Sequence, residues 1–109
     1  MIGIDIEEVD RFDLPKNHAF LKKVFTKSEI DYAFSKTKPA IHLCGMFCAK
    51  EATIKALPIK IQPKDILIMR NKQGKPSIKL RKHLRGHTLA LSISHSTNYA
   101  VAVVLDHEL

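Results

Sequence analysis

The feature that most constrains the fold is a long helical stretch between two prolines. Pro39 suits the first turn of a helix, where its fixed φ is tolerated, and Pro58 cannot continue one. Between them, in "GMFCAKEATIKAL" at residues 45–57, apolar residues recur at helical spacing. The pattern predicts one helix over residues 39–57. Its embedded charges, Lys50, Glu51 and Lys55, belong either to a solvated face or to a functional site.

A strand is expected at the start of the chain. "MIGIDIEEV" alternates, with three isoleucines on one side and Gly3, Asp5 and Glu7 on the other. Alternation of this kind predicts a strand with one buried face. Because an acid in mid-strand is disfavoured in a packed position, the pattern alone places Asp5 toward solvent.

The remaining segments complete an α+β pattern. Residues 17–25 carry apolar side chains at helical spacing, and Thr26 followed by Glu29 is a capping box that starts a second helix. The turn signal "KQGK" separates two short strand patterns, and "LALSISHS" and "YAVAVVL" form a second hairpin candidate. Helices set apart from a mainly antiparallel sheet predict an α+β fold. With 109 residues and no linker, the sequence favours one domain over residues 1–109.

Charge and cysteine usage narrow the classes of function. The formal net charge is +7, which favours polyanionic partners such as nucleic acid, acidic proteins or phosphorylated small molecules. No targeting segment or membrane-spanning stretch is recognised, so an intracellular, cytoplasmic protein without a membrane partner is expected. The two cysteines, Cys44 and Cys48, are spaced for one helix face and are expected to be small core residues.

Four residues are candidates for a functional site, and each could instead have a purely structural role. Glu51 and Lys55 stand at i and i+4, which suits either an exposed ion pair or a site. His95 ends a strand pattern, where a core-edge histidine and a functional one are both plausible. No G-x-S-x-G elbow supports a serine hydrolase, and no P-loop or zinc spacing occurs. Asp5 and Glu51 suit Mg²⁺ if the fold brings them together.

Taken in order, the motifs resemble a known family. "GIDIEEVDRF", "FTKSE", "GMFCAKEATIKAL", "DILI" followed by "GKP", and "SISHS" followed by "YAVAVV" are together similar to holo-acyl-carrier-protein synthase, the small 4′-phosphopantetheinyl transferase. The resemblance covers nearly the whole chain. It implies the 4′-phosphopantetheinyl transferase fold and a homotrimer with active sites at subunit interfaces.

The resemblance also implies a reaction. Such enzymes transfer 4′-phosphopantetheine from coenzyme A to a serine of apo-acyl carrier protein in fatty acid biosynthesis. They require Mg²⁺ and release adenosine 3′,5′-bisphosphate. Attack on the β-phosphorus builds charge on the pyrophosphate, which a metal ion stabilises as a Lewis acid.

Site residues follow from the same resemblance. Its motifs assign Asp5 and Glu51 to the metal, and Arg11 to docking of the carrier. They assign catalysis to Glu51, Lys55 and His95, with Lys55 serving the leaving phosphate. The base stays open between Glu51, acting through a metal-bound water, and Lys55, if nearby Lys50 and desolvation lower its pKa. The residues expected to contact coenzyme A are Lys55, Lys75, Pro76, His95 and Ser96.

Two positions depart from the family pattern. Met46 stands where many members carry a basic residue, and Pro58 follows the helix where a glycine-containing loop is common. Both departures concern contacts to coenzyme A and to the carrier. The alternative function is that of a non-catalytic basic module that binds RNA or an acidic protein. For the transferase, no nucleic-acid partner is expected.

Overall fold

The computed structural model describes residues 1–81, 84 and 86–107 of the chain. In this part of the chain the predicted order of one strand, three helices and four strands is confirmed. The elements are β1 (Ile2–Glu8), the 3₁₀ turn η1 (Val9–Phe12), α1 (Ala19–Val24), α2 (Lys27–Phe34), α3 (Pro39–Ala56), the 3₁₀ turn η2 (Pro63–Asp65), β2 (Ile66–Arg70), β3 (Pro76–Leu80), β4 (Leu89–His95) and β5 (Tyr99–Asp106).

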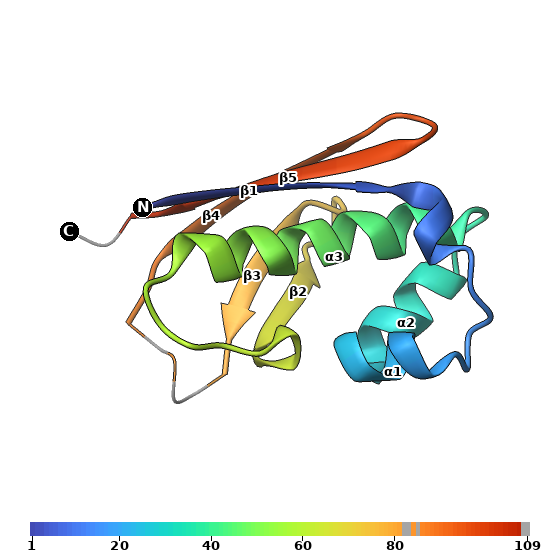
Figure 1. Ribbon diagram of the computed structural model, residues 1–109, viewed down its shortest axis with the longest axis horizontal. Helices are drawn as coiled ribbons and strands as arrows, with labels where there is room; N and C mark the ends of the chain where they lie inside the picture. Colours follow the sequence, from blue (N-terminus) through green and yellow to red (C-terminus); the bar gives the residue numbers. More distant parts are fainter. Residues whose placement is uncertain (82–83, 85, 108–109) are drawn as a thin grey trace.

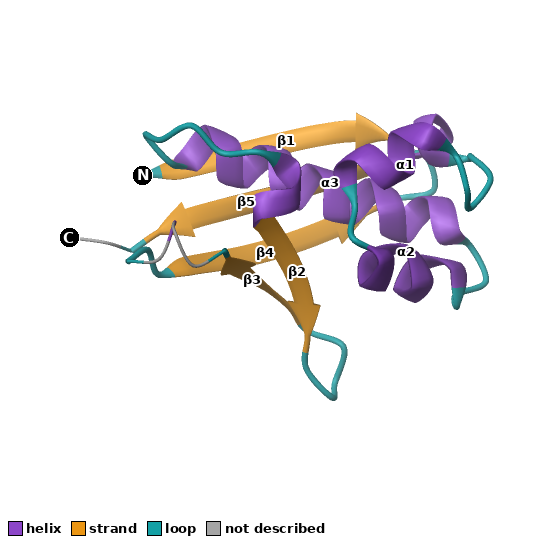
Figure 2. Cartoon of the chain, turned by 90° about the horizontal axis from the view of Figure 1, so that it is seen from below, coloured by secondary structure: helices purple, strands orange, loops and turns teal. Residues whose placement is uncertain are grey.

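The α+β architecture has a helix beneath an antiparallel sheet. β1, β5 and β4 form the sheet in that order, and α3 runs along one face of it (Figure 1). The β2–β3 hairpin forms a second sheet that contacts α3 and β4 and projects away from the main sheet (Figure 2). α1 and α2 lie at the N-terminal end of α3, so α3 is the element that every other layer touches.

Local signals explain where the helices begin and end. Pro39 occupies the first turn of α3, and the helix ends at Ala56, before Pro58. The predicted capping box is present in α2, because Thr26 Oγ1 accepts a hydrogen bond from the Glu29 N–H and the Glu29 side chain accepts one from the Thr26 N–H. Both boundaries agree with the sequence prediction.

The face of β1 that packs against the helix is the reverse of the predicted one. Ile2, Ile4 and Ile6 are 66%, 60% and 62% exposed, whereas Gly3 and Asp5 are buried. The opposing faces of β5 and α3 present small side chains, chiefly alanine and cysteine, so the helix approaches the sheet closely. Bulky isoleucines do not fit such a contact, and the expectation that Asp5 faces solvent was therefore wrong.

Gly3 marks the closest approach of strand and helix. A Cβ atom on Gly3 would lie 1.9 Å from the Ala52 carbonyl oxygen, which is backbone and cannot move aside. We expect Gly3→Ala to lower the free energy of unfolding by about 3 kcal/mol, the upper end of the usual overpacking penalty. Urea denaturation measures this loss.

The matched control is Gly45 on α3. Its added Cβ would meet only the Ile93 side chain, at 3.2 Å, and alanine improves helix propensity. Gly45→Ala is therefore expected to change the free energy of unfolding by no more than about 1 kcal/mol. Equal losses in the two variants would contradict the assignment of Gly3 as the close-contact position.

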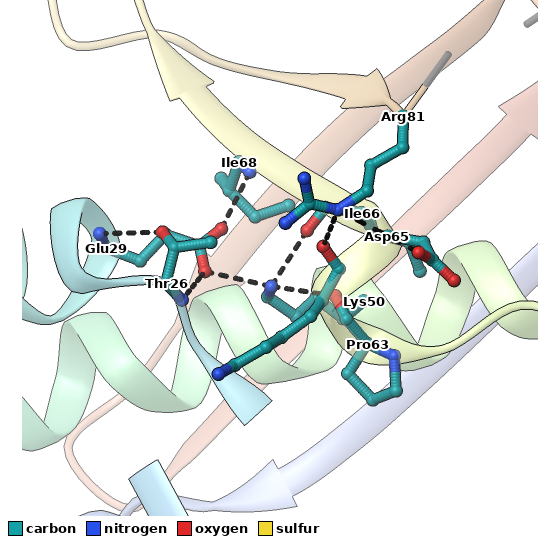
Figure 3. Close-up of polar contacts among 9 residues, drawn as sticks. Thr26, Glu29, Lys50, Pro63, Asp65, Ile66, Ile68 and Arg81 are labelled. Carbon is teal, nitrogen blue, oxygen red and sulfur yellow. Dashed lines mark hydrogen bonds and ion pairs between the residues drawn. The ribbon is translucent and has the colours of Figure 1, made fainter. Parts of the chain in front are cut away.

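Lys50 is the largest charged side chain in the core. It is fully buried, and its ammonium contacts Glu29 Oε1 at 2.9 Å and donates to the Pro63 and Ile66 carbonyl oxygens at 2.9 and 2.8 Å (Figure 3). Glu29 also accepts a hydrogen bond from the Ile68 N–H at 2.9 Å. One ion pair thus ties α3 to α2 and to the start of the β2–β3 hairpin.

Candidate functional site

A carboxylate and an ammonium meet where β1 crosses the C-terminal half of α3. Asp5 Oδ1 lies 3.1 Å from Lys55 Nζ, and the same ammonium donates to the Ile4 carbonyl oxygen at 2.9 Å. Asp5 Oδ2 is buried and has no hydrogen-bond partner in the described residues. An unpaired buried carboxylate oxygen is costly unless a cation or a donor completes its environment.

Glu51 belongs to the same cluster by its electrostatics. Burial is the largest cause that raises the pKa of Glu51, and the charge of Asp5 raises it further. The charges of Lys55 and Arg11 lower it. No ion pair joins Glu51 to Lys55 in the described residues, because Lys55 turns to Asp5 instead. The surface ion pair suggested by the i, i+4 spacing is therefore not formed.

A third carboxylate, that of Glu7, lies beside Asp5 and was not recognised from the sequence. Burial raises the pKa of Glu7, and the neighbouring carboxylate of Asp5 raises it further. On its other side Glu7 forms an ion pair with Arg11. The strand alternation that puts Asp5 and Glu7 on one face was a signal that could have found it.

The acidic residues suit Mg²⁺ better than a structural metal that is held by protein side chains alone. No cluster of three or more histidine, cysteine, aspartate or glutamate side chains in the described chain has an arrangement that could hold an ion. Mg²⁺ needs fewer protein ligands, since it usually keeps waters and takes substrate phosphate oxygens. Asp5 offers an unpartnered oxygen and Glu51 a second carboxylate whose ionised form is disfavoured without a counter-charge. The donor set is therefore suited to Mg²⁺ with a phosphate ligand.

Lys50 does not take part in this cluster. It points to the other side of α3, into the core pair with Glu29, and burial lowers its pKa. Lys50 and Lys55 are five positions apart on the helix, so their side chains face different directions. Met46 is also buried, so it offers no exposed side chain in place of the family's basic residue.

Arg11 lies on the surface next to the acidic cluster. Its guanidinium carbon lies 5.7 Å from the centre of the Phe12 ring and 5.6 Å from that of Phe47. Half of the side chain is exposed, and its guanidinium Nη1 forms the ion pair with Glu7. The arrangement presents a cation on an aromatic support.

His95 and Ser96 line a separate cleft of about 560 Å³ at the N-terminal end of α3. Lys38 and Thr37 also line this cleft, and the sequence prediction missed both. Nearby, the pKa of His42 is lowered by burial and then by the charges of Arg70, Lys36 and His95. Positive groups from several elements therefore gather around this end of the helix.

The remaining coenzyme A candidates lie on the β2–β3 hairpin. Lys75 is in its turn, where its N–H donates to the Asn71 side chain at 2.9 Å, and Pro76 begins β3 opposite Arg70. Neither residue contacts the Asp5 cluster in the described structure. Lys75 and Pro76 therefore belong to the side of the molecule on which Arg70 and His42 lie.

The sheet register separates the two groups of candidates. Asp5, Ala102 and Ile93 stand in one row across the three strands, and His95 is two residues further along β4. Two strand spacings and two residues of rise place the Asp5 and His95 backbones roughly 12 Å apart. No hydrogen bond or ion pair joins His95 to Asp5, Glu51 or Lys55 among the described residues.

The two cysteines are core residues, as predicted. Both are buried and free, and their thiols donate to the carbonyl oxygens of Glu7 and Ala100 at 3.6 and 3.3 Å. None of the helices in the described chain is long and apolar enough to cross a membrane.

Comparison with known proteins shows similarity along almost the entire chain. The family model of the 4′-phosphopantetheinyl transferase superfamily matches residues 1–104. The chain is 40% identical to the holo-[acyl-carrier-protein] synthase of Caldicellulosiruptor saccharolyticus, with 95% of this chain and 93% of that protein covered. It is 39% identical to the synthase of Thermodesulfovibrio yellowstonii, with 95% of each covered.

Solved structures agree with the sequence relatives. The holo-[acyl-carrier-protein] synthase of Helicobacter pylori in complex with coenzyme A matches with a TM-score of 0.84 and 32% identity over 97% of this chain and 99% of that one. The synthase of Bacillus anthracis, in complex with coenzyme A (3′,5′-ADP), matches with a TM-score of 0.81 and 32% identity, covering 99% and 96% of the two chains.

Proposed function

The chain belongs to the holo-[acyl-carrier-protein] synthases of the 4′-phosphopantetheinyl transferase superfamily, and we propose that it transfers 4′-phosphopantetheine from coenzyme A to a serine of an apo-acyl carrier protein. The observation that carries the proposal is the cluster of Asp5, Glu51 and Lys55 between β1 and α3. We place the reaction in fatty acid biosynthesis in the cytoplasm, with residues 1–109 acting as one domain.

Asp5 and Glu51 are the residues that would hold Mg²⁺. When bound, the ion would supply Lewis-acid stabilisation of charge on the pyrophosphate oxygens. The unpartnered Asp5 oxygen and the raised pKa of Glu51 support this assignment, because both describe carboxylates in need of a counter-charge. The two relatives solved with coenzyme A support its role as the co-substrate.

The proposed reaction forms one bond and breaks one. The carrier serine oxygen bonds to the β-phosphorus of coenzyme A, and the bond from that phosphorus to the bridging oxygen breaks, releasing adenosine 3′,5′-bisphosphate. We assign Lys55 as a donor to the leaving phosphate, and its contacts to Asp5 and the Ile4 carbonyl oxygen support this role. Glu51 is also the candidate to take the serine proton, because its carboxylate belongs to the same cluster as Asp5 and Lys55.

The cleft at the N-terminal end of α3 suits the phosphorylated adenosine of coenzyme A. His95, Ser96 and Lys38 offer donors to phosphate, and a volume of about 560 Å³ is within the size range of ligand sites. We assign Lys75 and Pro76 to the same co-substrate from the neighbouring hairpin. Arg11 would dock the acidic carrier, and the net charge of +7 would steer both polyanions toward the protein.

A homotrimer would unite the two groups of candidates. The Asp5 cluster and the His95 cleft lie apart within one chain, so a site that uses both is built most simply from two subunits. β1 is an edge strand, and its outer face carries three exposed isoleucines with Tyr99 and Leu105 of β5 beside them. An exposed apolar face of this kind typically marks a protein interface.

We expect Ile4→Glu to dissociate the assembly and to abolish most of the transfer activity. A charge buried in an apolar contact is unfavourable, and each separated subunit would lack half of its site. Light scattering after size exclusion should show three times the 12.3 kDa of one chain for the wild type and a single chain for the variant. Met69→Glu, at an exposed methionine on β2, should leave the mass unchanged.

The proposed function is tested by following its second product. Purified protein, coenzyme A, Mg²⁺ and an apo-carrier should release one adenosine 3′,5′-bisphosphate per carrier modified. A carrier whose acceptor serine is replaced by alanine should release none, and EDTA should stop the reaction until Mg²⁺ is restored. Absence of release with several apo-carriers would contradict the proposal.

A further inference from the structure

Two cations and a histidine converge on one aromatic ring, that of Tyr32 near the end of α2. The Arg70 guanidinium carbon lies 4.6 Å from the centre of this ring. The Lys36 ammonium lies 5.0 Å from the same centre. The His42 ring of α3 meets the Tyr32 ring edge-on, with the two centres 5.8 Å apart. These four residues, which we call the Tyr32 cluster, come from α2, the segment after it, α3 and the end of β2.

The positive charges of the Tyr32 cluster have no acidic counterpart. No ion pair joins Lys36 or Arg70 to a carboxylate among the described residues. The two charged groups lie at most roughly 10 Å apart, because both contact one ring, and exposed charges still repel at that separation in about 0.1 M salt. Burial lowers the pKa of His42, and the charges of Arg70 and Lys36 lower it further. An anion at this place would therefore relieve the repulsion among several groups.

The Arg70 guanidinium is held in place with donors to spare. Its Nη1 donates to the Gly74 carbonyl oxygen at 3.1 Å, in the turn of the β2–β3 hairpin. Its Nε is buried and has no hydrogen-bond partner in the described part of the chain. A guanidinium carries five N–H donors in a fork that matches a phosphate, and the bond to Gly74 uses one of them. This bond and the contact with Tyr32 orient the group before a ligand arrives, which lowers the cost of binding.

The Tyr32 cluster is open to solvent beside the His95 cleft. Lys36 is exposed, and the other three members of the cluster are half-buried. The next two residues of the chain, Thr37 and Lys38, line the cleft that also contains His95. The charge of His95 also lowers the pKa of His42. A ligand can thus reach the cluster without opening the core, either as a separate molecule or as part of one that occupies the cleft.

We propose that the Tyr32 cluster binds a phosphate group, with Arg70 and Lys36 as the charged donors and His42 beside them. A phosphate dianion balances two cations, and its oxygens can accept hydrogen bonds from both at once. The phosphate can belong to a free phosphorylated molecule. It can also be the ribose phosphate of coenzyme A, which the adenosine 3′,5′-bisphosphate of the proposed reaction retains. Only this second source rests on the proposed function.

The test titrates the isotopically labelled full chain with sodium phosphate at neutral pH and constant ionic strength, and separately with sodium acetate. Phosphate should give saturable shifts of the His42 ring nitrogens, with a dissociation constant on the order of 1 mM from two or three charge-assisted hydrogen bonds. The pKa of His42 should rise on binding, because a nearby anion favours the protonated ring. Acetate should bind at least about tenfold more weakly, since its single charge cannot balance both cations.

Variants of the cluster separate this site from unspecific attraction to a basic protein. Arg70→Gln should weaken phosphate binding at least about tenfold, the effect of losing a charged donor. Lys36→Ala should weaken it about threefold and is expected to fold, since Lys36 is exposed. The control is Lys72→Ala, at an exposed lysine in the β2–β3 turn, which should change the affinity less than about twofold. It removes the same charge as Lys36→Ala, so a difference between the two is local.

Coenzyme A and dephospho-coenzyme A, which lacks the ribose phosphate, identify the source of the phosphate. If coenzyme A supplies it, Arg70→Gln should weaken binding of coenzyme A about tenfold and that of dephospho-coenzyme A less than about twofold. If a separate molecule supplies it, inorganic phosphate should still bind to protein that is saturated with coenzyme A. Either result supports the site.

Three results of the phosphate titration would overturn the proposal: shifts that do not saturate, equal affinity for phosphate and acetate, and full affinity in both cluster variants. Tighter capture of a phosphate-free acidic peptide than of phosphate would also overturn it, because the cluster would then be a docking surface for a protein. The phosphate titration contains neither coenzyme A nor a carrier. Its failure and a failure of the transferase assay are therefore independent results.

Discussion

Replacing Glu51 by glutamine is expected to lower kcat/KM for carrier modification by at least about a hundredfold, the usual scale for removing a charged group that acts on the transition state. Glutamine keeps the shape of the side chain but is a poorer ligand for Mg²⁺ and cannot accept the serine proton. Asp5→Asn should have a comparable effect, since it removes the second charge of the proposed metal pair. Steady-state kinetics with an apo-carrier measures both losses.

The stability of the Glu51→Gln variant distinguishes a functional role from a structural one. Burial and the charge of Asp5 both disfavour the ionised form of Glu51 in the folded protein. Its neutral replacement should therefore leave the melting temperature unchanged or raise it. Glu8→Gln, at an exposed acid at the end of β1, serves as the control and should keep wild-type activity. An active Glu51→Gln variant would contradict the assigned site.

Lys50→Met is expected to cause the largest loss of stability, about 3–5 kcal/mol in the free energy of unfolding. The substitution leaves the Glu29 carboxylate buried without its counter-ion. The carbonyl oxygens of Pro63 and Ile66 lose their donor at the same time. The polar link from α3 to α2, η2 and β2 would then be lost, while the hydrogen bond from the Ile68 N–H to Glu29 would remain (Figure 3).

Urea denaturation with a matched lysine tests this expectation. Lys60→Met, at an exposed position in the segment after α3, should change the free energy of unfolding by no more than about 0.5 kcal/mol. If Lys50→Met lost less than about 1 kcal/mol, the buried pair would be contributing little and the hairpin would be anchored elsewhere.

The sequence was most informative where structure depends on neighbours along the chain. The two prolines set the limits of α3, the Thr26 and Glu29 pair set the start of α2, and the turn signals placed both hairpins. These features are local, so backbone geometry and short-range hydrogen bonds are enough to specify them. The family followed from the order of motifs rather than from any single one.

The orientation of β1 could not be obtained from its alternation. The pattern defines two faces but does not say which one meets the helix. The outcome depended on Gly3 and on the small residues of α3 and β5, which allow close packing that isoleucine would prevent. The same error placed Asp5 in solvent, although it proved to be the buried half of the Lys55 contact.

The spacing of residues in the sequence also did not predict which side chains form ion pairs between different elements. Lys55 was spaced for Glu51 and instead contacts Asp5, and Lys50 belongs to Glu29 in the core. Glu7 shares a face of the strand with Asp5, and it was overlooked because the alternation does not show that this is the buried face. The two lysine contacts each join residues from different elements, so tertiary packing decides them.

The most direct test of the account is the intact mass of an apo-acyl carrier protein after incubation with this protein, coenzyme A and Mg²⁺. Transfer of the 4′-phosphopantetheine group predicts a gain of roughly 340 Da on the carrier, at its acceptor serine. The gain should be absent with Glu51→Gln and present with Glu8→Gln. An unchanged carrier mass, with folded protein and several apo-carriers, would contradict the central claim.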